Sequence, residues 1–195
     1  AMYRAMTLFS MQKGYISSSQ FCVQDLIDNL DNASLKFIYN ESLGYAEMYL
    51  NDVNVEKSIR SLEVSNLVSK VSAIPEVRKK LVAIQKEIGK NKAVVMDGRD
   101  IGSVVFTDAE LKIFMTSSAE TRARRRFDEL IQKGENVSYD DVYTNVVERD
   151  RVDTSRKDSP LVKADGAIEI DNSELSKEKQ FEIILKLVEE KLRDI

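Results

Sequence analysis

One stretch decides the fold predicted for this chain: AVVMDGRDIG, residues 93–102. Its first four residues are a continuous apolar run that ends in Asp97, a pattern typical of parallel strands buried on both faces. A second run of this kind is Leu111-Lys-Ile-Phe-Met115, and a last strand is expected at Ala167–Ile170. Helical patterns lie between these runs. Strands that alternate with helices predict an α/β fold with a parallel sheet.

The helices of the second half have clear sequence signals. A capping box, Ser117 to Glu120, opens a helix that runs to Gly134. Asp140 to Glu148 continue helically into a charge-dense stretch that ends before Pro160. The C-terminal helix is expected to pack on the sheet through four apolar residues: Phe181, Ile184, Val188 and Leu192.

The first half has a different organisation, in which a hairpin is surrounded by helices. A helix is expected to begin at Met2 and to stop at Gly14, and glycines at such positions commonly end helices. The remaining elements expected here are a short helix at Asp25–Leu30, a hairpin of Leu35–Asn40 with Glu47–Asn51, and helices at Val55–Val71 and Glu76–Ile88. The hairpin and the two helices after it predict an inserted subdomain at residues 34–88.

Composition describes one compact domain over residues 1–195 and excludes several kinds of chemistry. The chain has 29 Lys+Arg against 33 Asp+Glu, and this acidic balance argues against bulk nucleic-acid binding. Cys22 is the only cysteine and histidine is absent, which excludes an internal disulfide, a His triad and a His-ligated metal. A lone thiol suits a reducing compartment. The longest apolar runs are far too short for a membrane-spanning helix.

The turn after the first apolar run is the first candidate site. Asp97 ends that run, so its carboxylate is expected at the carboxyl edge of the sheet, where open α/β folds bind ligands. Gly98 would let the backbone approach a ligand closely, and Arg99 and Asp100 add a cation and an anion to one turn. The alternative is an ordinary strand-to-helix turn with a local ion pair.

Arginine supplies the second and third candidate sites. Its planar fork of donors suits phosphate, and several converging forks can offset repulsion between two phosphates. One group lies in the run Arg122 to Arg126, where some side chains must face solvent. The other is Arg149-x-x-x-Asp153-x-x-Arg156, whose spacing predicts one helical face in a segment too polar to pack. A mobile lid over phosphates and an exposed, salt-bridged helix both fit that segment.

The absence of histidine is compatible with one reaction class in particular. When a nucleoside monophosphate accepts a phosphoryl group, the attacking atom is a phosphate oxygen, which is largely ionised at neutral pH because its second pKa is about 6. No general base is needed. Positioning, arginine and magnesium can supply most of the catalysis.

Several motifs together resemble the bacterial cytidylate kinase family, in order and spacing over essentially the whole chain. They are Ala1-Met-Tyr-Arg4, Ile59-Arg-Ser-Leu-Glu-Val64, Pro75-Glu-Val-Arg78, Asp97-Gly-Arg-Asp-Ile-Gly-Ser-Val-Val-Phe106, Arg125-Arg126 and Arg149-Asp-Arg-Val-Asp-Thr-Ser-Arg156. The resemblance implies a three-layer P-loop kinase-like fold with an inserted nucleoside monophosphate-binding subdomain at 34–88 and a short lid at 148–166.

The resemblance also implies roles for individual residues. Ser69, Arg78 and Asp100 would read the cytosine base, with Tyr3 lining this site. The acceptor phosphate would be clamped by Arg4, Arg99, Arg149 and Arg156; Asp153 would hold the sugar hydroxyls, Arg122, Arg125 and Arg126 would bind the ATP phosphates, and Asp97 would orient hydrated Mg²⁺.

One element of the family pattern is not found. The phosphate-binding loop G-x-x-x-x-G-K-[ST] matches at none of the seven glycines, and Gly89-Lys90 is the only Gly-Lys pair. The resemblance begins partway into the family pattern, so we expect a chain that lacks the N-terminal strand and the P-loop.

The function expected from the resemblance is transfer of the terminal phosphoryl group of ATP to CMP or dCMP, with Mg²⁺, by a cytoplasmic monomer. Three alternatives remain open at this point. They are a non-catalytic nucleotide-binding fragment, a kinase for another nucleoside monophosphate, and an RNA-binding helix at Arg122 to Arg126. The last is the weakest, because that run has no interleaved aromatic residues.

Overall fold

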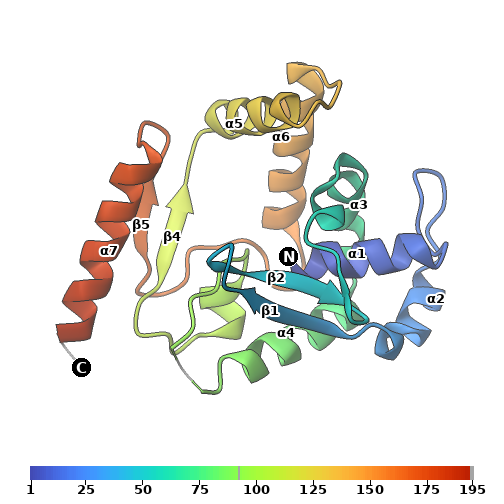
Figure 1. Ribbon diagram of the computed structural model, residues 1–195, viewed down its shortest axis with the longest axis horizontal. Coiled ribbons are helices and arrows are strands. Elements are labelled where there is room, and N and C mark those ends of the chain that lie inside the picture. Colours follow the sequence, from blue (N-terminus) through green and yellow to red (C-terminus); the bar gives the residue numbers. More distant parts are fainter. Residues whose placement is uncertain (92, 194–195) are drawn as a thin grey trace. The chain divides into compact units, whose positions relative to one another are not determined.

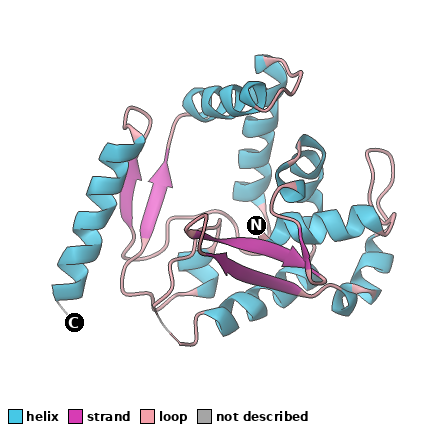
Figure 2. Ribbon diagram, in the orientation of Figure 1, coloured by secondary structure: helices cyan, strands magenta, loops and turns pink. Residues whose placement is uncertain are grey.

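The computed structural model describes residues 1–91 and 93–193 (Figure 1). The chain divides into two compact units, the first Ala1–Lys90 and the second beginning at Asn91. Residues 34–88 lie in the first unit together with the N-terminal helix, whereas residues 148–166 lie in the second. Helices predominate in both units, and each unit holds one small sheet (Figure 2).

The α-helices of the first unit agree in number with the pattern of the sequence, and the largest difference in a boundary is at the start of the third. Two short 3₁₀ turns, η1 and η2, accompany four α-helices: α1 (Met2–Gln12), α2 (Val23–Asp28), η1 (Leu30–Asn32), η2 (Ser58–Arg60), α3 (Leu62–Ser72) and α4 (Pro75–Ile88). The helix predicted to begin at Val55 begins instead at Leu62. Ser61 caps it, because its side chain accepts a hydrogen bond from the Val64 amide.

The predicted hairpin is confirmed. Strand β1 (Leu35–Asn40) pairs antiparallel with β2 (Tyr45–Leu50), in a register that sets Leu35 opposite Leu50. A third, two-residue strand, β3 (Val53–Asn54), pairs with the end of β2. Gly44 has a φ of 71°, which a glycine adopts without strain, and it closes the connecting turn one residue before β2.

One apolar core holds the first unit together. Phe9 and Met6 of α1, Met48 of β2 and Leu81 of α4 are among its fully buried side chains. The apolar residues of α1 recur at a helical spacing, so one face of this helix contacts α3 and the sheet. This core positions Tyr3 and Arg4, which lie on the same helix.

The second unit has the parallel pairing expected of an α/β fold. Its elements are the π-helix η3 (Ile101–Val105), β4 (Ile113–Thr116), α5 (Ala119–Gln132), α6 (Tyr139–Ser155), β5 (Ile168–Asp171) and α7 (Lys177–Arg193). Strands β4 and β5 pair in parallel, with Ile113 opposite Ile168 and Thr116 opposite Asp171. The mixed α/β class with a parallel sheet is therefore confirmed.

The strand predicted at Ala93 to Met96 was wrong. The described residues of this segment have no regular structure, and Val95 is completely exposed. A strand needs a neighbour that takes up its backbone hydrogen bonds. Among residues 1–91 and 93–193, no strand pairs with this segment, so its apolar run alone does not make it a strand.

The expected packing of the C-terminal helix holds only in part. Ile184 and Val188 of α7 are half-buried, but Phe181 and Leu192 are 65% and 67% exposed. The sheet of this unit has two strands within the described residues, which is too narrow to cover the whole apolar face of a 17-residue helix.

Serine side chains cap the N-termini of the two long helices between β4 and β5. The cap of α5 is Ser118, one residue later than the predicted capping box, and its side chain accepts from the Thr121 amide. Ser138 caps α6 in the same way, accepting from the Asp141 amide. The two helices pack on each other, and Arg124 lies over the Tyr139 ring at 4.4 Å from its centre.

No helix in the described part of the chain is both long enough and apolar enough to span a bilayer.

Candidate functional site

A buried carboxylate between two arginines is the centre of the candidate site in the second unit. Asp153 lies in the last turn of α6 and its side chain is 3% exposed. One carboxylate oxygen, Oδ2, accepts a hydrogen bond from Arg99 Nε at 2.9 Å. The other, Oδ1, accepts from the Arg156 guanidinium. The structure therefore joins residues that are 54 positions apart in the sequence.

Local structure explains why Arg156 can reach Asp153. Helix α6 ends at Ser155, and Arg156 has extended backbone angles, so its side chain turns back over the last helical turn. The Leu161 amide donates to the Asp153 carbonyl at 2.8 Å and holds the following segment in place. The prediction that this segment is too polar to pack was wrong for Asp153 and Arg156, because pairing with each other allows both to be buried.

Arg149 adds a third cation on the same face of α6, one turn before Asp153. Burial lowers the pKa of its guanidinium, and the nearby charge of Arg99 lowers that pKa further. Its Nε atom is buried and has no hydrogen-bond partner within the described part of the chain. Three guanidinium groups beside one carboxylate give the cluster a net formal charge of +2, which favours binding of an anion.

The turn that carries Arg99 is built on a π-helix. Asp100 is 3% exposed, and its backbone carbonyl accepts from the amides of Val104 and Val105 at 2.9 and 3.3 Å. Asp97 is exposed. A Cβ added at Gly98 would lie 2.8 Å from the Ile101 side chain, so the fold itself favours glycine at this position. This turn therefore presents Arg99 to α6 and keeps Asp100 inside.

The arginines of α5 all have protein partners. Arg122 donates to the Ser117 carbonyl at 3.0 Å and, through Nη1, to the Asp150 carboxylate at 2.9 and 2.7 Å. Arg126 donates to Glu129 at 2.8 Å. A hydrogen bond from Lys133, together with Arg126, lowers the pKa of Glu129 from 4.5 to about 2. The contact of Arg122 with Asp150 joins α5 to α6, whereas the contact of Arg126 with Glu129 lies within α5.

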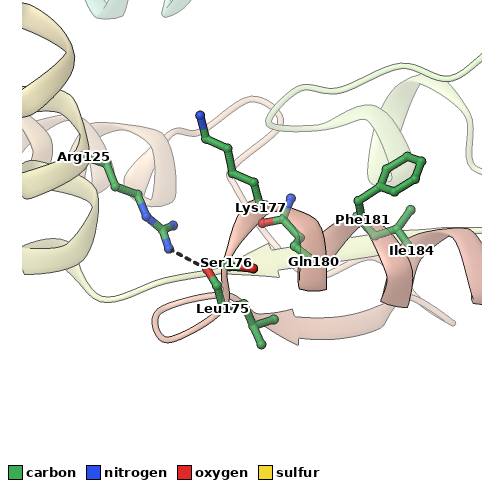
Figure 3. Close-up of a pocket in the computed structure, with 7 residues that line it drawn as sticks. All are labelled: Arg125, Leu175, Ser176, Lys177, Gln180, Phe181 and Ile184. Carbon is green, nitrogen blue, oxygen red and sulfur yellow. Dashed lines mark hydrogen bonds between the residues drawn. The ribbon is translucent and has the colours of Figure 1, made fainter. Parts of the chain in front are cut away.

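Arg125 links α5 to the segment after β5 and borders an open cavity of about 650 Å³. It donates to the Asn172 side chain at 3.0 Å and to the Asn172 carbonyl at 2.6 Å. In Figure 3 the Arg125 guanidinium turns toward Leu175, and Lys177 is a second cation at the edge of the same cavity. The cavity is lined by two cations and by polar and apolar side chains: Arg125, Leu175, Ser176, Lys177, Gln180, Phe181 and Ile184.

The first unit brings together the other predicted site residues. Arg78 on α4 is 4% exposed, its guanidinium carbon lies 5.5 Å from the centre of the Tyr3 ring, and it donates to the Ser72 carbonyl at 3.1 Å. Ser69 lies one turn before Ser72 on α3, and its carbonyl accepts from the Ser72 hydroxyl. Tyr3, Ser69 and Arg78 are thus linked through α3 and α4.

Arg4 has separate partners in the first unit. It donates to the Ile59 carbonyl at 3.0 Å and to the Ser65 hydroxyl at 2.8 Å. The residues predicted to read the base are divided between the units, since Ser69 and Arg78 belong to the first and Asp100 to the second.

Sequence reasoning missed the residues that hold the arginines. Asp150, Asn172 and Ser65 bind Arg122, Arg125 and Arg4, respectively. For two of them, the place in the sequence could have indicated this role, because Asp150 directly follows Arg149 and Asn172 directly follows a strand. Ser65 had no such signal, since its pairing with Arg4 depends on how α1 packs against α3.

The magnesium site expected at Asp97 would have few protein donors. Within residues 1–91 and 93–193, no three His, Cys, Asp or Glu side chains come together as a metal-binding group. Mg²⁺ commonly uses one or two carboxylates with water and substrate phosphates, so an exposed carboxylate such as that of Asp97 fits this mode of binding.

Comparison with known proteins gives a consistent result. The family model described as cytidylate kinase matches residues 1–190. A cytidylate kinase of Flavobacterium johnsoniae is 64% identical over 188 residues, which is 96% of this chain and 82% of that protein. A cytidylate kinase of Flavobacterium psychrophilum is 62% identical, over 96% of this chain and 83% of that protein. One from Cytophaga hutchinsonii is 42% identical over all 195 residues, or 82% of its own length.

Proposed function

The chain belongs to the cytidylate kinase family, and on that premise we propose that it transfers the terminal phosphoryl group of ATP to CMP or dCMP, giving ADP and CDP or dCDP. The observation that carries this proposal from the structure is the cluster of Arg99, Arg149 and Arg156 around the single carboxylate of Asp153. Its net positive charge is partly shielded from water, so a phosphate dianion is a ligand of opposite, complementary charge.

The acceptor phosphate is bound by this cluster. Arg149 has an unpartnered Nε, and Arg99 offers Asp153 only its Nε at hydrogen-bond distance, which leaves its terminal amino groups for a phosphate oxygen. Arg4 supplies a further guanidinium from the first unit. Charge-assisted bonds of this kind contribute about 1.5 to 3 kcal/mol each, enough together to offset repulsion between the two phosphates that must meet.

The base is read by Ser69, Arg78 and Asp100, with Tyr3 against it. Cytosine offers an amino donor, which suits a carboxylate, and acceptors that suit Arg and Ser. The cation–π contact of Arg78 with Tyr3 supports this role, because it fixes the guanidinium of a buried arginine.

ATP binds on the α5 side of the second unit. Arg125 and Lys177 border a cavity that also has apolar lining, a combination that suits a ligand with both anionic and apolar parts. Arg122 and Arg126 extend the row of cations along α5. Asp97 would hold Mg²⁺, which when bound neutralises charge on the transferring phosphates.

The parallel pair β4–β5 belongs, in this proposal, to a three-layer P-loop kinase-like fold. Residues 34–88 form the inserted substrate-binding subdomain and residues 148–166 the lid. The lid assignment is supported by the position of Arg149, Asp153 and Arg156, which all lie in that segment and form the cation cluster. The single cysteine of the chain supports a reducing, cytoplasmic setting, and we propose that the enzyme acts as a monomer.

Replacing Asp100 tests the reading of the base. In Asp100→Ala we expect the ratio of kcat/KM for CMP to that for UMP to fall by at least about tenfold, because discrimination by a hydrogen-bonded pair is about 1–3 kcal/mol. Steady-state rates with CMP, dCMP, UMP and AMP measure this ratio. Asp108→Ala, an exposed acid in the loop before β4, is the control. An unchanged substrate ratio in Asp100→Ala would contradict the assignment.

Replacing Arg156 tests the phosphate clamp. Arg156→Ala is expected to lower kcat by about 10³-fold, the scale of loss when an arginine that stabilises a transferring phosphate is removed. Arg151→Ala is the matched control on the exposed side of the same helix, where Arg151 pairs with Glu148. Equal rates for Arg156→Ala and the unaltered protein would remove Arg156 from the site.

A further inference from the structure

Asp153 uses both of its carboxylate oxygens to hold arginine side chains. Each oxygen accepts from a different arginine, Oδ2 from Arg99 and Oδ1 from Arg156. These arginines reach it from opposite directions in the sequence, one from the turn before the π-helix and one from the residue after α6. The carboxylate is therefore the point at which the two segments converge.

We propose that Asp153 is a positioning residue for the phosphate clamp, holding Arg99 and Arg156 together before any nucleotide binds. The inference rests on the proposed function, because it concerns the arginines assigned there to the acceptor phosphate. It goes beyond contact between Asp153 and the sugar, since it assigns to the carboxylate a role in the free enzyme.

Electrostatics explains why such a residue is needed. Arg99, Arg149 and Arg156 are like charges, and the effect is already visible in Arg149, whose pKa is lowered by burial and by Arg99 but raised by Asp153. Without a carboxylate among them, guanidinium groups in a partly buried site separate or seek water. Asp153 keeps them in place until a phosphate arrives with more negative charge.

Burial shows that the carboxylate is committed to the cluster. The Asp153 side chain is 3% exposed and that of Arg156 is 8% exposed, whereas that of Arg99 is half exposed. The chain offers a matched contrast in Glu148 and Arg151, another carboxylate–arginine pair three residues apart on α6. Its side chains are 56% and 68% exposed, and an exposed pair of this kind contributes little.

The two possible roles of Asp153 make different predictions for a substrate that has no sugar hydroxyls. Each carboxylate oxygen has two lone pairs, so hydrogen bonds from the arginines leave room for a hydroxyl as well. If contact with the sugar were the whole role, removing the hydroxyls from the substrate would abolish the effect of changing Asp153. If Asp153 positions the arginines, that effect is the same for both substrates.

The experiment measures kcat and KM of the unaltered chain, Asp153→Asn and Glu148→Gln with CMP and with 2′,3′-dideoxy-CMP. We expect Asp153→Asn to lower kcat by about 10²-fold with both substrates, the scale of loss when catalytic groups are misplaced by about 1 Å. Glu148→Gln is expected to match the unaltered chain. A loss seen with CMP but absent with dideoxy-CMP would overturn the proposal, as would full activity of Asp153→Asn.

Two further measurements keep the test decisive. Thermal unfolding shows whether Asp153→Asn is folded. If it is not, Asp153→Glu, which moves the carboxylate by one methylene, takes its place. The criterion stays the same: equal loss of kcat with both substrates.

Phosphorylation of CMP by the unaltered chain tests the proposed function separately. If that reaction is absent, calorimetric binding of CMP and dideoxy-CMP applies the same criterion to affinity, and a change confined to CMP overturns the positioning role.

Discussion

The two units of this protein are stabilised in different ways. In the first, α1, α3, α4 and the hairpin bury one apolar core. In the second, five apolar side chains are buried among the described residues, namely Val105, Ala123, Leu130, Val142 and Ile170. Its elements are joined instead by polar contacts of arginine, such as those of Arg99 with Asp153 and of Arg125 with Asn172.

This difference shows which side chains can affect stability alone and which can affect both stability and ligand binding. Apolar packing is non-directional, so it tolerates changes in polar groups at its edge. Arginine contacts that join elements are directional, and the same guanidinium groups are candidates for binding phosphate. We therefore expect substitutions in the apolar core of the first unit to act mainly on stability, and substitutions at the arginine contacts of the second unit to act on activity as well.

The largest effect should come from matched changes of phenylalanine to alanine in the two units. Phe9→Ala is expected to lower the free energy of unfolding of the first unit by about 3–5 kcal/mol, because Phe9 is 1% exposed and its removal leaves a cavity. Phe181→Ala, at a site that is 65% exposed, is expected to change stability by less than about 0.5 kcal/mol. Urea unfolding measures both, and similar losses at the two sites would break the comparison.

A smaller effect is expected from the pair Arg122–Asp150, which holds α5 to α6. Because the pair is about one-third exposed, Asp150→Asn should reduce stability by about 1 kcal/mol or less. We expect its effect on kcat to equal that of Arg122→Gln if the pair only positions the helices. The exchanged double variant, Arg122→Asp with Asp150→Arg, should then recover most of the activity.

The same double variant distinguishes a direct role for Arg122. An arginine that binds ATP phosphates cannot be replaced by an aspartate, so failure of the exchange to restore kcat, with KM for ATP raised, would assign Arg122 to ATP. The control is Arg124→Gln, because the guanidinium of Arg124 is exposed and lies over the Tyr139 ring. This variant shows the effect of losing a cation from the surface of α5.

The smallest effect concerns acid and Glu129. Its pKa is lowered to about 2 in the folded chain, mainly by the hydrogen bond from Lys133, so it binds protons more weakly there than in the unfolded chain. The stability that it contributes is therefore present above pH 4.5 and is lost as pH falls toward 2. Glu129→Gln should be slightly less stable than the unaltered chain at pH 7, with the difference vanishing near pH 2. Thermal unfolding across this range checks it, and a constant difference would contradict the pairing.

Much of the first unit could be predicted from its sequence, because local signals and burial agree there. The spacing of apolar residues predicted α1 and α4, and the turn around Gly44 predicted the hairpin. The start of α3 was missed, since the helical periodicity extends back to Val55 although the capping hydroxyl belongs to Ser61. A cap depends on one hydrogen bond, which a hydrophobic pattern does not reveal.

Less of the second unit could be predicted, because its order depends on partners distant in the sequence. The apolar run at 93–96 has the composition of a strand, but composition does not supply a neighbour for its backbone. The spacing of Arg149, Asp153 and Arg156 predicted one helical face, which holds for Arg149 and Asp153 on α6 but not for Arg156, because the helix ends at Ser155. It did not show that Asp153 is buried, because that depends on Arg99, 54 residues away.

The π-helix at Ile101–Val105 has a consequence for the length of the chain at this point. The Phe106 amide donates to the Ile101 carbonyl, a turn that encloses one more residue than an α-helical turn does. An α-helix advances by about 100° per residue. Loss of a single residue from this segment would therefore rotate Arg99 and Asp100 away from their present directions relative to β4, even though every side chain that contacts a ligand were kept. The spacing between Asp100 and the sheet is thus a quantity on which selection can act, independently of which amino acids fill it.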